Sequence, residues 1–144
     1  MKFLLLNNGI HYKNYNAITS YKCYDVTEIE VNNETKTIQG LEKLYDFSIQ
    51  DFDIIYSPSM PYDIKNYPKQ KFVFGPHFSV FPEKEDMEMI SYPNAVYLQP
   101  SLWPIEHWKT YQHCKKVNFQ IMPFGVDTKL YKPIKNINER KKVF

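Results

Sequence analysis

A series of short apolar runs, separated by longer amphipathic stretches, restricts the fold of this 144-residue chain more than any other feature. Lys2 to Leu6 is apolar at nearly every position, and Asp53 to Ser57 and Lys71 to Gly75 follow the same pattern. Continuous apolar runs of this length are typical of strands buried on both faces of a sheet. We expect strands there and in three further runs: Val26 to Val31, Ala95 to Gln99 and Val117 to Met122.

The stretches between these runs carry apolar residues at helical spacing. Ile38, Leu41 and Leu44 recur in this way within Thr35 to Phe47. Further helices are expected at Asn16 to Tyr24, from Pro82 to Asp86 onward, and at Pro104 to His113. Alternating strands and helices predict an α/β fold, with a doubly wound, mainly parallel, Rossmann-like sheet covered by helices on both faces.

Composition excludes several classes of protein. Hydrophobic residues make up 43% and charged residues 24%, as in an ordinary globular domain, and the net charge of +2 is spread along the chain. A nucleic-acid-binding domain usually gathers its basic residues on one face, so we expect no nucleic-acid partner. The two cysteines, Cys23 and Cys114, lie far apart, which favours a reducing, cytoplasmic location. No apolar stretch is long enough for a transmembrane segment.

Candidate binding residues follow the predicted strands, because ligands of a doubly wound sheet bind beyond the carboxyl ends of its strands. Of five such strand ends, four carry hydroxyl, amide or imidazole groups beside Gly or Pro, which can hydrogen-bond a polyhydroxylated ligand. Polar loops punctuated by Pro and Gly explain part of the same pattern. The candidate substrate-binding residues are Asn8, Gly9, His11, Ser57, Ser59, Ser101 and Trp103.

His77 is the candidate catalytic residue. It follows a predicted buried strand and the turn Gly75-Pro76, so it should project into the cleft. A histidine in that place can accept a proton or hydrogen-bond a substrate near neutral pH. The alternative is an imidazole packed on Phe78 and Phe81, with its nitrogens bonded to the backbone.

Other chemistries fit the sequence less well. The segment Asn7 to His11 lacks the second and third glycines of a dinucleotide-binding fingerprint. His107 and Cys114 share a helix face but have no second pair of ligands, so no metal site is expected. The acids of Glu83 to Glu88 crowd into one helical turn, which favours a solvated helix start over a pair of glycosidase carboxylates.

The run PFGVDTKLYKP, Pro123 to Pro133, resembles the segment that joins the two domains of GT-B glycosyltransferases of the family 4 type. In that family a proline turn after the last strand leads into a V-D-x-x-x-[FY]-x-P pattern. The matching residues are Val126, Asp127, Tyr131 and Pro133. A second run, VYLQPSLWPIEHW, resembles the family's fifth strand and following helix, and the final KKVF resembles the first strand of its C-terminal domain.

The resemblance implies that residues 1–125 form the Rossmann-like N-terminal, acceptor-side domain of a two-domain GT-B fold. Residues 126–144 would be the interdomain linker and the start of a missing C-terminal domain. It further implies a glycosyltransferase that moves a sugar from a nucleotide-sugar to a glycan or lipid-linked acceptor, with the nucleotide-sugar as co-substrate and no bound metal or cofactor. The family's glycine loop maps onto Asn8-Gly9, and its cleft histidine maps onto His77.

The expected partners are therefore a glycan or glycolipid acceptor and, together with the missing domain, a nucleotide-sugar; peripheral contact with a membrane is compatible with them. The chain alone should be inactive, because transfer requires donor and acceptor to be held together. Two alternatives stay open: a stand-alone, non-catalytic binding module with a Rossmann-like fold, and an unrelated small α/β nucleotide-binding protein.

Overall fold

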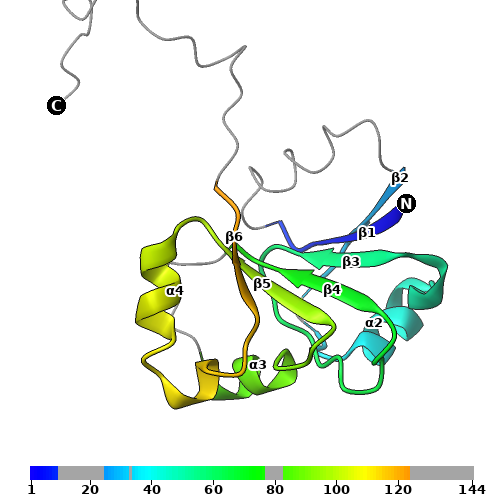
Figure 1. Ribbon diagram of the computed structural model, residues 1–144. Coiled ribbons are helices and arrows are strands. Elements are labelled where there is room, and N and C mark those ends of the chain that lie inside the picture. The colour runs from blue at the N-terminus through cyan, green and yellow to red at the C-terminus, as the bar shows by residue number, and fades with distance from the viewer. Residues whose placement is uncertain (10–24, 33, 77–82, 124–144) are drawn as a thin grey trace, which may run out of the picture.

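The described part of the chain folds around one parallel sheet. The computed structural model describes residues 1–9, 25–32, 34–76 and 83–123. They form a six-stranded sheet of order β2-β1-β3-β4-β5-β6, in which all neighbouring strands are parallel (Figure 1). The strands are β1 (Lys2–Asn7), β2 (Asp25–Glu30), β3 (Ile54–Ser57), β4 (Lys71–Phe74), β5 (Ala95–Gln99) and β6 (Phe119–Ile121). The predicted α/β, Rossmann-like sheet is confirmed.

The described helices pack on one face of this sheet. They are α2 (Ile38–Tyr45), α3 (Lys84–Met89) and α4 (Leu102–Trp108), with short 3-10 turns η1 (Ile49–Asp51) and η2 (Gln112–Cys114). Figure 1 shows α2 and α3 on the same side of the strands. Ile38, Met87 and Ile105, one from each helix, belong to the same core cluster. The helix predicted at 16–24 and the linker predicted at 126–144 lie outside the described residues.

Successive side chains of each strand point to opposite faces of the sheet, so the apolar residues form two clusters, one on each face. Leu4 and Leu6 point into the large core under the helices, whereas Leu5 points to the opposite face. There Leu5 packs with Tyr56, and both side chains are almost fully buried. The central strands are thus buried on both faces, which is why their sequences are continuously apolar.

Helix α4 begins and ends earlier than the sequence predicts. Pro104 lies in its first turn, where a missing amide hydrogen breaks no helical hydrogen bond. The backbone amide of Thr110 donates to the carbonyl oxygen of His107 at 3.1 Å, and the Thr110 hydroxyl donates to the same oxygen at 2.7 Å. This turn ends the helix, and the predicted continuation to His113 is replaced by η2.

The start of α2 is fixed by two threonines and a glycine. The Thr37 side chain caps the helix by accepting from the Gly40 amide at 3.1 Å. The Thr35 hydroxyl in turn accepts from the Thr37 amide at 3.1 Å. Both hydroxyls therefore lie against Gly40. A Cβ atom at that position would lie 2.8 Å from Thr37 Oγ1 and closer still to Thr35 Oγ1.

Substituting Gly40→Ala should destabilise the protein, although alanine is the better helix former by about 1 kcal/mol. The added methyl group must displace a hydroxyl that caps the helix, and crowding of this kind costs roughly 1–3 kcal/mol. Urea unfolding measures the change, with the exposed Gln39→Ala as the control for helix propensity. In the Thr35→Ala background the cost of Gly40→Ala should shrink. A Gly40→Ala protein that gains stability would contradict the assigned contact.

Candidate functional site

The strand order places a topological switch point between β1 and β3. After β1 the chain passes to β2 on one side, whereas β3, β4, β5 and β6 follow in sequence on the other. Ligands of open α/β sheets bind at such a point, beyond the carboxyl ends of the strands. Leu5 pairs with Tyr56 in register, so the loops that follow β1 and β3 leave the sheet as neighbours. These loops and the strand ends before them carry the predicted residues Asn8, Gly9, Ser57 and Ser59.

The loop after β1 is a tight turn held by Asn7. The Gly9 amide donates to Asn7 Oδ1 at 2.8 Å, while Asn7 Nδ2 donates to a carboxylate oxygen of Glu28 on β2. Gly9 has φ +77°, a conformation that residues with a Cβ atom rarely adopt. A Cβ atom there would meet nothing within 4 Å, so the backbone conformation, not lack of space, favours glycine. Asn7, which the sequence did not single out, positions this loop.

Ser57, the last residue of β3, and Ser59 in the following loop are both enclosed. Ser57 and Ser59 are 2% and 4% exposed. The Ser57 hydroxyl donates to the carbonyl oxygen of Met60 at 2.6 Å and also accepts from the Met60 amide at 3.4 Å. Ser57 therefore closes the turn after β3, and its hydroxyl is committed to the fold.

The predicted residues Ser101 and Trp103 lie farther along the same edge. Ser101 precedes α4 as its N-cap residue, with no capping hydrogen bond from its side chain, and Trp103 in the first turn is 60% exposed. In the strand order β5 is three positions from β1, which corresponds to about 14 Å at the usual strand spacing. The described candidates thus form two groups on one edge. His11 and His77 lie outside the described residues.

Gln99, the last residue of β5, lies at the same edge of the sheet, and the sequence did not single it out. Its side chain shares the helix-covered face with Ala95 and Tyr97, and it is 0% exposed. Neither Nε2 nor Oε1 has a hydrogen-bond partner among the residues that the structure describes. In the sequence, Gln99 could have been noticed because it lies two residues after Tyr97, on the face of the strand that points into the core. Its complete burial could not have been predicted, because it depends on tertiary packing.

The carboxyl ends of five of the six strands carry no charged residue in the described part of the chain, and we call them the uncharged rim. The exception is β2, which ends in Glu30 and whose Glu28 accepts a hydrogen bond from Asn7 of this rim. The rim residues contain no Asp, Glu, Lys, Arg or His within the described part of the chain. They are Asn7–Gly9 at the end of β1, Ser57–Ser59 at the end of β3, Gly75–Pro76 after β4, Gln99–Ser101 at the end of β5 and Met122–Pro123 after β6. The polar groups on this rim are amides, hydroxyls and backbone groups. Such groups suit a neutral ligand that both donates and accepts hydrogen bonds.

No three His, Cys, Asp or Glu residues come together as a metal site in the described residues. The His107 and Tyr111 rings meet edge-on at 5.7 Å, and the Tyr111 and His113 rings lie 5.8 Å apart. These imidazoles are therefore part of a short aromatic row. Cys114 is fully buried, and burial raises the pKa of its thiol to about 11.

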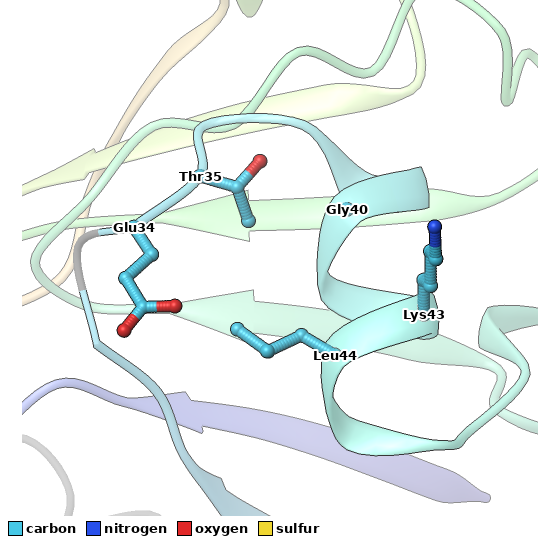
Figure 2. Close-up of a pocket in the computed structure, with 5 residues that line it drawn as sticks. All are labelled: Glu34, Thr35, Gly40, Lys43 and Leu44. Atoms are coloured by element: carbon cyan, nitrogen blue, oxygen red, sulfur yellow. The ribbon is translucent and has the colours of Figure 1, made fainter.

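A shallow, open depression of about 340 Å³ lies between α2 and the loop that follows β2. Figure 2 shows Leu44 projecting from the helix toward the loop that carries Glu34 and Thr35. Gly40 and Lys43 complete its lining. None of the predicted binding residues contributes to it, and its exposed charges distinguish it from the uncharged rim.

Comparison with protein-family models, with curated proteins and with solved structures finds no match for this chain. Among the helices of the described residues, none combines the length and the apolar character needed to cross a bilayer. The parallel sheet, its switch point and the uncharged rim are thus the features from which function is inferred.

The Cys114 thiol should resist alkylation in the folded protein. The reactive species is the thiolate, and a pKa of about 11 leaves very little of it near neutral pH. Because the folded pKa is raised, the stability due to the protonated thiol is complete below the unfolded pKa and is lost as pH rises toward 11. Iodoacetamide labelling of a Cys23→Ser protein, followed by mass spectrometry, tests this. Urea is the positive control, and rapid labelling without urea would contradict the assigned burial.

Proposed function

We propose that this chain is the acceptor-binding domain of a glycosyltransferase. The observation that carries the proposal is the uncharged rim, which gathers neutral hydrogen-bonding groups at the sheet edge where α/β proteins bind ligands. A sugar acceptor is a neutral ligand with many hydroxyls, each of which donates and accepts. Amide and hydroxyl groups match that chemistry, whereas a phosphate group would favour cationic side chains.

Trp103 adds an apolar surface to the polar rim. Its side chain is 60% exposed and lies in the first turn of α4, directly after Ser101 and Leu102. The C–H groups on one face of a sugar ring are apolar and can pack on an indole, which carries a large apolar area. The rim would then hydrogen-bond the hydroxyls while Trp103 covers the ring.

The enzymatic part of the proposal rests on the sequence resemblance in Pro123 to Pro133 and in Val96 to Trp108. On this proposal a second domain supplies the nucleotide-sugar site, and the reaction takes place between the two domains in the cytoplasm. The chain itself holds the acceptor hydroxyl in position. Positioning alone can contribute about 7–11 kcal/mol to lowering a barrier, but only when both reactants are held.

Purified residues 1–144 should bind neutral saccharides and transfer nothing. In saturation-transfer NMR, lactose and methyl α-glucoside should receive magnetisation from the protein, and UDP-glucose should not displace them. Incubation with UDP-glucose and lactose should give no trisaccharide by mass spectrometry. Displacement of the saccharides by UDP-glucose, or formation of the trisaccharide, would contradict the assignment of an acceptor-only domain.

Trp103→Ala should weaken saccharide binding by roughly tenfold, about 1.4 kcal/mol, through loss of the surface under the ring. Leu44→Ala is the matched control, since Leu44 is also a large, exposed apolar residue (47%) but lies on α2 beside the shallow depression. Titration by NMR gives both affinities. Equal weakening by the two variants, or none by Trp103→Ala, would exclude Trp103 from the site.

A further inference from the structure

The amide of Gln99 is a buried polar group of the rim, and neither of its polar atoms has a hydrogen-bond partner among the described residues. Its side chain is 0% exposed. Burying a donor and an acceptor without partners opposes folding, whereas an apolar side chain of similar size would not. A residue that lowers the stability of the fold, at the edge of the sheet where α/β proteins bind ligands, is a candidate ligand-binding residue.

The position of Gln99 restricts what can pair with it. It is the last residue of β5 and pairs in register with Ile121 of β6, while β4, on the other side, continues into the buried residues Gly75 and Pro76. None of these neighbours carries a charge. The amide therefore favours a neutral partner that presents an acceptor and a donor side by side.

We propose that Gln99 is a ligand-binding residue whose amide receives two adjacent hydroxyls of a neutral sugar. This inference rests on the proposed function and names one residue that would bind the acceptor sugar. One hydroxyl donates to Oε1, and its neighbour accepts from Nε2. Because Gln99 has no exposed surface, binding requires the sugar edge to displace the groups that cover the carboxyl end of β5, while Trp103 stays outside on the first turn of α4.

An enclosed water is the competing occupant. Buried waters commonly satisfy interior polar groups through two to four hydrogen bonds. In that case Gln99 would be a structural residue: its removal would change stability, and sugar binding would stay the same. A ligand-binding role predicts that sugar affinity falls and stability does not, because the wild-type amide has no partner among the described residues until the ligand binds.

The test compares Gln99→Met with wild type, since methionine has nearly the same shape as glutamine but neither polar atom. Gln112→Met is the matched control, because Gln112 is exposed in η2. The thermal midpoint and the affinity for methyl α-glucoside and lactose are measured for each protein. Gln99→Met should have an equal or higher midpoint and bind at least roughly tenfold more weakly, whereas Gln112→Met should match wild type in affinity.

Unchanged sugar affinity in Gln99→Met overturns the inference about Gln99, and it leaves the proposed function intact if wild type binds sugar. A wild-type protein that binds neither saccharide overturns both. Wild-type binding of uridine in place of sugar, lost in Gln99→Met, would overturn the sugar ligand and the acceptor-binding function together. If Gln99→Met does not fold, Gln99→Leu replaces it with the same expected outcomes.

Discussion

The parallel direction of every strand is the constraint on which the rest of the structure depends. Because all strands of the sheet run the same way, all their carboxyl ends meet at one edge. Residues that are distant in sequence, such as Gly9, Ser57 and Ser101, are brought to that edge by topology alone. Each successive step from β3 to β6 moves in the same direction across the sheet. Same-handed crossovers then place the described helices on one face.

Some residues of the rim are held in hydrogen bonds that serve the fold, whereas the amide of Gln99 makes none with the described residues. Ser57 closes the turn after β3, and Asn7 bridges the loop after β1 to Glu28 on β2. These contacts fix the backbone of two adjoining loops. Trp103 is exposed on the same edge, and Gln99 is enclosed without a partner in the described residues.

Much of the fold could be predicted from the sequence, and the reason differs between elements. The strands β1, β3 and β5 were found because burial on both faces requires continuous apolar residues. The predicted end of α4 at His113 was wrong. Tyr111 continues the helical spacing of Ile105 and Trp108, but the turn at Thr110 ends the helix before it. A local hydrogen bond overrode the periodic pattern in that case.

The candidate site was predicted as an edge of the sheet, but the role of each residue was not. The sequence does not reveal that the Ser57 hydroxyl is used within its own turn. It also does not reveal that the Gln99 amide is buried without a partner among the described residues, because that depends on packing between separate segments. Both facts come from tertiary structure and change which residues a ligand would touch.

The most direct test of the account is to map a neutral saccharide onto the backbone by amide chemical-shift perturbation. Addition of lactose to ¹⁵N-labelled residues 1–144 should shift the amides of Gly9, Ser101 and Trp103 on the uncharged rim. It should leave those of Gly40 and Gln112, which lie off the rim on α2 and η2, unchanged. Perturbations centred on Gly40 or Gln112, with none on the rim, would contradict the central claim that this edge receives a neutral sugar.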